Sequence, residues 1–302
     1  MSSRVSPTEA VPGTAAQSWS PPQPSAAPLA VILASGDGGS GALINLEASD
    51  DEVHMWSSPI RIPQPALYLS PRSFDLYIPD LLFFGDSTTA ASDRSVEFQA
   101  KCLVDSMKRL GVDKYCVAGI SYGGFVAYRV AEMAGEGAVE RVVVMTAGIV
   151  AGEEERRELV EREGRDVSDV LLPRRPEDLM ELIRRSMVRP PRWMPEFLLM
   201  DFIEVMYKDR RKERVELLKY LIAKGAGVDP LPVLKQETLI LWGDQDTVFP
   251  ISLAYKLQRH LGPKARLEVI KDAGHALPLE KPDLVNHMIE WFLTEPYQSV
   301  ST

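Results

Sequence analysis

Short apolar runs alternate with helical patterns along most of the chain and predict an α/β fold. Residues 115–118 and 141–145 are continuously apolar over most of their length, which is typical of parallel strands covered on both faces by helices. Further strands are expected at 29–34, 43–47, 53–56, 74–78, 238–242 and 266–270, and helices at 94–110, 251–261 and 282–293. This alternation predicts a doubly wound, mostly parallel sheet with right-handed crossovers.

The alternation of predicted strands and helices ends near Gly148. Only helices are expected from there to residue 235, at 153–165, 177–187, 196–207 and 210–224. Helices without strands, placed between two strands of one sheet, predict an inserted lid at 149–235. The core of the fold would then consist of residues 29–148 and 236–295. Pairs of arginines recur in the insert, and we interpret them as ordinary surface charge.

The two ends of the chain are expected to lie outside this fold. Residues 1–28 are rich in Ser, Pro and Ala and have almost no large apolar side chain, so they cannot offset the cost of ordering and are predicted to be disordered. Residues 296–302 are expected to form a tail. Residues 59–71 carry four prolines and are expected to be irregular.

Composition narrows the classes of partner. A net charge of −9 argues against a nucleic-acid partner. No apolar stretch approaches the roughly 20 residues that span a bilayer, and no secretory signal is visible. Cys102 and Cys116 fall on a helical pattern and in a strand, so we interpret both as buried thiols outside any disulfide or metal site. A cytoplasmic protein is expected, with a plastid location as the alternative.

The segment 115–134 carries the strongest chemical signal. An apolar strand leads into Gly119-Ile-Ser121-Tyr-Gly123, and a helical pattern follows. The spacing Gly-x-Ser-x-Gly between strand and helix is that of a nucleophile elbow, where glycines allow a sharp turn that exposes the serine hydroxyl. The N–H of Tyr122 would lie at the helix N-terminus and could face a developing oxyanion.

Two further residues are expected beyond the carboxyl ends of later strands, where catalytic groups gather in open α/β sheets. Asp246 follows the strand at 238–242, and His275 follows the strand at 266–270. Ser121, Asp246 and His275 would act as nucleophile, orienting acid and general base. Asp244 is the alternative acid. His54, His260 and His287 lie in the N-terminal region or on helices, and we interpret them as surface or packing residues.

Four blocks carry a resemblance to the α/β-hydrolase superfamily with a helical lid. They are FDLYIPDLLFFG, VAGISYGGFVAYRVAEM, LILWGDQDTVFP and DAGHALPLEKPDLVNHMIEWFL, in the order of that superfamily and across residues 74–293. The chain resembles plant esterase-like, monoacylglycerol-lipase-like and meta-cleavage members. The resemblance implies that Asp246 is the acid, since it takes the fifth place in the pattern Trp-Gly-x-x-Asp.

One block of that superfamily differs here. No His-Gly pair, which would supply the second oxyanion donor, occurs before Ser121. In one interpretation the run at 29–34 is the strand in question, and Gly36 and Asp37 belong to an altered oxyanion loop. In the other, which we favour, the block is missing and residues 65–73 join one strand region directly to the next.

These features predict a serine hydrolase that cleaves carboxylic esters, with lipid-like acyl esters among the candidate small-molecule substrates. A C–C bond hydrolase is the alternative enzyme, although Ala276 stands where those relatives often place Trp. A ligand-binding protein with weakened catalysis is the alternative from another class, which the missing His-Gly pair favours. No metal or cofactor is implied, and oligomeric state is left open.

Overall fold

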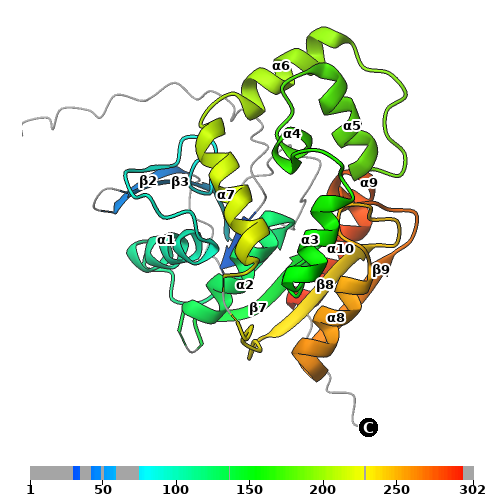
Figure 1. The fold of residues 1–302 in the computed structure, drawn as a ribbon. Helices are drawn as coiled ribbons and strands as arrows, with labels where there is room; N and C mark the ends of the chain where they lie inside the picture. Colours follow the sequence, from blue (N-terminus) through cyan, green and yellow to red (C-terminus); the bar gives the residue numbers. More distant parts are fainter. Residues whose placement is uncertain are drawn as a thin grey trace, which may run out of the picture.

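The computed structural model describes residues 30–34, 42–48, 51–58, 75–135, 137–227 and 229–294, with side chains from residue 76 onward. A nine-stranded sheet forms its centre, in the order β2-β3-β4-β1-β6-β7-β8-β9, with β5 paired to β3 (Figure 1). The strands are β1 (Ala30–Ala34), β2 (Ala42–Ala48), β3 (Asp51–Ser58), β4 (Asp75–Pro79), β5 (Thr88–Thr89), β6 (Tyr115–Ile120), β7 (Val139–Met145), β8 (Glu237–Gly243) and β9 (Ala265–Ile270).

Strand direction divides the sheet into two halves. Strands β6 to β9 pair in parallel. Strand β1 lies between β4 and β6 and is antiparallel to both, so β4 and β6 run in the same direction and β1 runs against them. Strands β2, β3 and β4 form an antiparallel meander. The predicted mostly parallel α/β sheet is confirmed, and the reversed direction of β1 is the difference.

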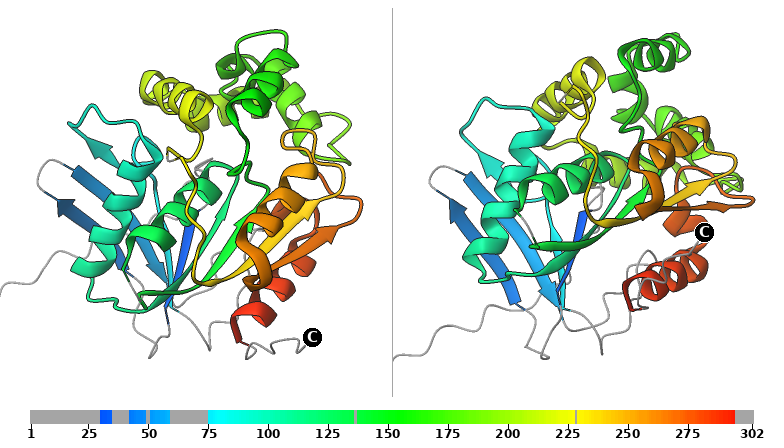
Figure 2. Two further views of the ribbon diagram at one scale, coloured as in Figure 1. Left: turned by 60° about the horizontal axis from the view of Figure 1, so that its bottom comes forward. Right: turned by 90° about the horizontal axis from the view of Figure 1, so that it is seen from below.

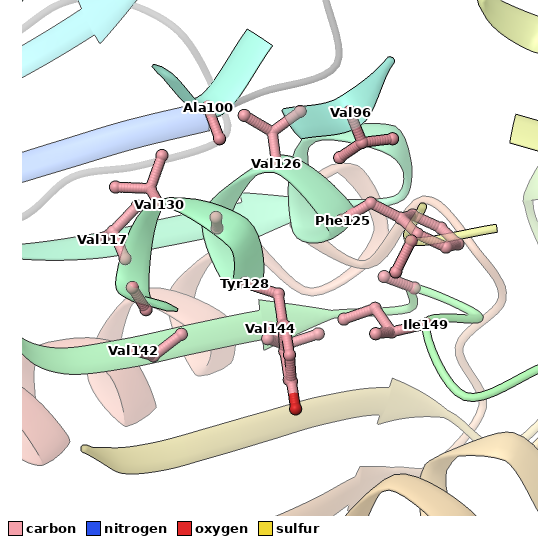
Figure 3. Close-up of a cluster of buried hydrophobic side chains, with 14 of the residues drawn as sticks. Val96, Ala100, Val117, Phe125, Val126, Tyr128, Val130, Val142, Val144 and Ile149 are labelled. Carbon is pink, nitrogen blue, oxygen red and sulfur yellow. The ribbon is translucent and has the colours of Figure 1, made fainter. Parts of the chain in front are cut away.

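Helices cover both faces of the parallel half (Figure 2). Helices α1 (Val96–Arg109), α2 (Tyr122–Met133) and α8 (Ser252–Leu261) pack on one face, and α10 (Pro282–Thr294) packs on the other. Successive side chains along a strand point alternately to the two faces of the sheet, so each strand contributes to the core on both faces. On β7, Val142 and Val144 point into the larger core, which Figure 3 shows around Val117, Val126 and Tyr128, whereas Val143 and Met145 point toward α10. This explains why these runs are apolar throughout.

Five helices occupy the chain between β7 and β8, and we call them the helical insert. They are α3 (Glu153–Glu161), α4 (Val167–Leu171), α5 (Pro176–Ser186), α6 (Glu196–Tyr207) and α7 (Arg211–Lys224). Figures 1 and 2 show that α4, α5 and α6 lie beyond the ends of the strands and not against a face of the sheet. The predicted absence of strands between these two core strands is confirmed within the described residues, and the role of the insert as a lid stays a prediction.

The helix and strand predictions agree with the structure to within a few residues at each end. Four short elements had no sequence prediction: β5, α4, the 3-10 helix η1 (Gly262–Lys264) and α9 (Leu277–Glu280). Each has five residues or fewer, too short for an apolar period to register. The expectations for residues 1–28, 59–71 and 296–302 lie outside the described residues. Cys102 and Cys116 are buried, as predicted.

Candidate active site

Ser121 occupies a sharp turn between β6 and α2. Its backbone has φ 53° and ψ −123°, a combination that L residues rarely adopt and that costs on the order of 1–3 kcal/mol. The turn is held because Ser121 N donates to Met145 O at 3.0 Å and Gly124 N donates to Ser121 O at 2.9 Å. Strain at one polar residue, supported by the neighbouring strand, indicates a functional position.

Two glycines make this turn possible. A Cβ on Gly119 would lie 2.1 Å from Gly123 O and 2.7 Å from Gly124 N, so backbone fills the space that a side chain would need. A Cβ on Gly124 would lie 2.5 Å from the Cβ of Ala147, two residues after the end of β7. The predicted close approach of strand and helix therefore agrees with the geometry at Gly119. The second crowded position is Gly124, one residue beyond Gly123, the second glycine of the motif.

Asp246 and His275 meet at the carboxyl ends of β8 and β9. The Nδ1 atom of His275 lies 3.0 Å from Oδ2 of Asp246. The other carboxylate oxygen accepts from Val248 N at 2.8 Å and Phe249 N at 2.9 Å. The side chain of Asp246 is fully buried, and that of His275 is 13% exposed. A buried carboxylate with these partners fixes both the orientation and the tautomer of the imidazole.

Asp244, the alternative acid, has backbone partners instead. Its Oδ1 atom lies 3.4 Å from Ala273 N, and its own N–H donates to Ile270 O at 3.0 Å. It therefore bridges the two loops that follow β8 and β9. Asp246 is the carboxylate that pairs with the histidine.

Ser121 and His275 line one cavity of about 410 Å³. Phe249 packs against the imidazole with ring centroids 5.8 Å apart, and also against Phe125 at 6.3 Å. The structure thus brings Ser121, His275 and Asp246 to one site from three separate parts of the chain. His260 and His287 lie on α8 and α10 as predicted, and His54 falls in a part whose side chains are not described.

The cavity wall is mainly apolar and is supplied largely by the helical insert. Four charged side chains interrupt it, and each has partners within the protein. Arg156 donates to Ala151 O, Ile222 O and Ala223 O, whereas Arg185 forms ion pairs with Glu163 and Glu181. Arg214 donates to Phe83 O and Met206 O and lies over the ring of Phe84. The apolar lining includes Leu159, Val160, Val170, Leu182, Leu217 and Leu221.

Tyr122 begins α2, so its N–H is one of the first-turn donors that have no acceptor inside the helix. Tyr122 directly follows Ser121 at the positive end of the helix dipole, which is the place predicted for an oxyanion donor. The ring packs against Phe84 with centroids 6.3 Å apart, and burial raises the pKa of its phenol. The side chain therefore stays neutral and fixes the backbone that carries the N–H.

Gly36 and Asp37 lie outside the described residues. The direction of β1 bears on their predicted role. Ala30 pairs with Gly119 and Leu33 pairs with Cys116, so the carboxyl end of β1 lies at the edge of the sheet opposite Ser121. This direction argues against an oxyanion loop formed by the residues that follow β1. The rival interpretation concerned residues 65–73, which are also outside the described part, so it stays a prediction.

Sequence reasoning missed two residues of this site. Phe249 packs on the imidazole of His275. The sequence feature that could have identified it is its position in the block LILWGDQDTVFP, shortly after Asp246. Glu280 contacts the backbone beside His275, five positions further along the chain. Among the described residues, no group of three or more His, Cys, Asp or Glu side chains could hold a metal ion. None of the described helices is both long and apolar enough to span a bilayer.

Comparison with known proteins identifies the family to which the chain is similar. A family model described as alpha/beta hydrolase family matches residues 31–288. Carboxylesterase YbfK of Bacillus subtilis is 24% identical over 271 residues, which cover 87% of this chain and 83% of that protein. A 2-hydroxy-6-oxononadienedioate/2-hydroxy-6-oxononatrienedioate hydrolase of Pseudomonas sp is 30% identical over 198 residues, which cover 62% of this chain and 65% of that protein.

The fold has solved counterparts as well. The structure of an esterase from Exiguobacterium antarcticum superposes with a TM-score of 0.64 at 18% identity, covering 84% of this chain and all of that one. The chain spans 58% to 65% of the length of three curated relatives, the Pseudomonas sp hydrolase included. Similarity at these identities shows the shared fold.

Proposed function

Since the chain belongs to the alpha/beta hydrolase family, we propose that it is a serine hydrolase that cleaves carboxylic esters. The observation that carries the proposal is the buried Asp246–His275 pair, at 3.0 Å, in the same cavity as the serine of the elbow. A buried acid, an oriented imidazole and a serine that lines the cavity are the components of nucleophilic acyl transfer. Esterases among its relatives support the same reaction class.

Each side chain has a definite step. His275 removes the proton of the Ser121 hydroxyl as oxygen attacks the ester carbonyl, and then gives that proton to the departing alcohol. Asp246 stabilises the positive charge that the imidazole gains. Tyr122 N–H donates to the oxyanion that forms on the carbonyl oxygen. Water, activated by the same imidazole, then hydrolyses the acyl-enzyme and releases the acid.

The wall of the cavity points to a neutral, apolar acyl group. Its aliphatic lining favours binding of an apolar group, by about 25 cal/mol for each Å² of apolar substrate surface removed from water. Its charged groups, Arg156, Glu163, Arg185 and Arg214, already have protein partners, so a charged substrate would have to displace one of them. A volume of about 410 Å³ is in the range of small-molecule sites.

A fluorophosphonate probe tests the proposal. Wild-type protein should be labelled, Ser121→Ala should not, and Ser252→Ala, which changes an exposed serine on α8, should be labelled like wild type. Hydrolysis of p-nitrophenyl esters from two to twelve carbons should then rise to an optimum at intermediate acyl length. No labelling of a folded wild-type sample would contradict the proposal.

A C–C bond hydrolase is the second candidate, and the Pseudomonas sp relative supports it. The name of that relative's substrate describes a dicarboxylate, whereas the arginines of this cavity are engaged by the protein, which favours the ester. A ligand-binding protein is the third, because the direction of β1 removes support for an oxyanion donor after residue 34. Ser121→Ala separates it from the enzymes, since binding would survive and turnover would not.

A further inference from the structure

The loop that carries His275 is held on both sides by the helical insert and one carboxylate. Directly before the histidine, Gly274 N donates to Oε2 of Glu280 at 2.6 Å. Directly after it, Ala276 N donates to Ser186 O at 2.8 Å. Ser186 is the last residue of α5, so a backbone atom of the insert contacts the residue next to the general base.

The second oxygen of Glu280 reaches the same part of the insert. Its Oε1 atom accepts from Val188 N at 2.8 Å and from Arg189 N at 3.2 Å. One carboxylate, at the end of α9, therefore accepts hydrogen bonds from the histidine loop through one oxygen and from the insert through the other. Hydrogen bonds to an ionised carboxylate are about twice as strong as those between neutral groups.

The contact between loop and insert is also tight. A Cβ on Gly274 would lie 2.7 Å from Ser186 O and 3.2 Å from Oε2 of Glu280, so the insert approaches the loop as closely as a glycine permits. The end of α5 touches the acid loop too, because Thr247 Oγ1 donates to Arg185 O at 2.8 Å. Both partners of the Asp246–His275 pair are thus fastened to one end of one helix.

We propose that Glu280 is a positioning residue that couples the seating of the helical insert to the placement of His275. Its carboxylate holds the histidine loop against residues 186–189, and the imidazole keeps its position beside Asp246 while that contact is made. Displacement of the insert breaks the bond from Ala276 N to Ser186 O and leaves the Glu280 carboxylate without its partners at Val188 and Arg189, so the loop is no longer held against the insert. The proposal rests on the proposed function, in which His275 is the general base.

Glu280→Gln is the informative substitution, because it keeps the shape of the side chain. The amide nitrogen is a donor and cannot accept a hydrogen bond. Either the Gly274 side or the Val188 side of the bridge must therefore be lost. Asp283→Asn is the matched control, since it removes a carboxylate that is exposed on the first turn of α10, three residues away.

Ester turnover and hydrogen exchange should be measured on full-length protein. For Glu280→Gln we expect kcat to fall about 10- to 100-fold, because small misplacements of a catalytic group cost rates of this order. KM should change less than about twofold, since the cavity wall is untouched. Amide exchange should become faster in both 186–190 and 272–279. Asp283→Asn should match wild type in all three measurements.

A double substitution shows whether Glu280 acts through the histidine. In a His275→Ala background, Glu280→Gln should not lower the residual rate further, because the group that it positions is gone. An additional loss of 10-fold or more would overturn the positioning role. A wild-type exchange pattern and a wild-type kcat in Glu280→Gln would overturn the coupling.

The experiments distinguish a failure of the proposed function from a failure of the role of Glu280. If wild-type protein shows no Ser121-dependent turnover, the proposed function falls, while faster exchange in both segments of Glu280→Gln would still support the contact between loop and insert. If turnover depends on Ser121 but Glu280→Gln changes neither rate nor exchange, the proposed function stands and the role of Glu280 falls.

Discussion

Ser121 and the two glycines beside it show how single residues shape the site. The serine has a positive φ of 53°, and Gly119 has no room for a Cβ. Strain and close packing are both tolerated because β7 hydrogen-bonds to the turn. The motif therefore meets steric requirements of the turn as well as supplying the serine hydroxyl.

Gly119→Ala should damage the fold as well as the site. Its new methyl group would meet the backbone of Gly123 and Gly124, which cannot move without shifting α2, so we expect a loss of about 3 kcal/mol or more in the free energy of unfolding. Gly152→Ala is the control, because its Cβ would meet nothing closer than 3.5 Å. Urea denaturation of both variants checks this, and equal midpoints would refute the steric explanation.

Asp246→Asn tests the acid without changing its shape. The amide no longer stabilises the imidazolium and can select the wrong tautomer, so kcat should fall about 10⁴-fold. Asp244→Asn should stay within about threefold of wild type, because Asp244 only bridges two loops. Ester hydrolysis under identical conditions distinguishes them. A larger loss for Asp244→Asn would mean that the pairing at 3.0 Å is not the catalytic one.

Arg156 shows how one element of the insert is fixed to another. It lies on α3 and donates to Ala151 O before that helix and to Ile222 O and Ala223 O near the end of α7. The same side chain lines the cavity. An arginine on α3 that bonds to the carbonyls of α7 therefore also shapes the cavity wall.

Arg156→Ala should loosen the insert and widen the cavity. We expect a loss of about 2–3 kcal/mol in unfolding free energy, since hydrogen bonds from a charged group are broken, and a higher KM for apolar esters. Arg157→Ala is the matched control: it lies one position along α3, is 62% exposed and pairs with neighbouring glutamates of its own helix. It should change stability by less than about 0.5 kcal/mol. Similar effects from both would rule out the proposed linkage.

Ionisable groups buried in the sheet should lower the stability of the whole molecule at alkaline pH. Burial raises the pKa of Cys116 from 9.0 to about 11 and that of Tyr115 from 10.0 to about 12. Both groups lie on β6 in the centre of the sheet. Because the unfolded chain ionises at lower pH than the folded one, protons leave the unfolded state first, and stability is lost as the pH rises.

Unfolding free energy should therefore be constant up to about pH 9 and fall from there to about pH 12, by at most about 1.4 kcal/mol per pH unit for each such group. Denaturant midpoints measured at several pH values check this. Cys116→Ala should reduce the slope between pH 9 and 10, where the tyrosines contribute least. An unchanged slope in that variant would show that the thiol does not titrate in this window.

Much of the fold and site could be predicted because the responsible signals are local. Tyr115–Ile120 is apolar throughout because helices cover both of its faces, and α2 and α10 show their apolar period directly. Ser121 is marked by the glycines around it, and Asp246 and His275 each follow an apolar strand. Their pairing followed from the rule that parallel strands end at one edge of a sheet.

The direction of β1 could not be predicted, because its run AVILA would suit either orientation. Strand pairing depends on contacts with residues about 45 and 85 positions away, which no local pattern records. The oxyanion interpretation built on Gly36 and Asp37 assumed the opposite direction. Glu280 was missed for a similar reason, since its partners Val188 and Arg189 lie more than 90 positions earlier in the chain.

By itself, the order of residues determined the longer helices and strands, the nucleophile elbow with its serine, and the short list of candidate acids and histidines, since each depends on spacing within a short segment. Folding decided that Asp246, and not Asp244, pairs with His275. Folding alone set the direction of β1, the apolar cavity beneath the insert, and the carboxylate bridge of Glu280. These features need backbone and side-chain atoms from distant segments to meet, and that meeting is a property of the packed molecule.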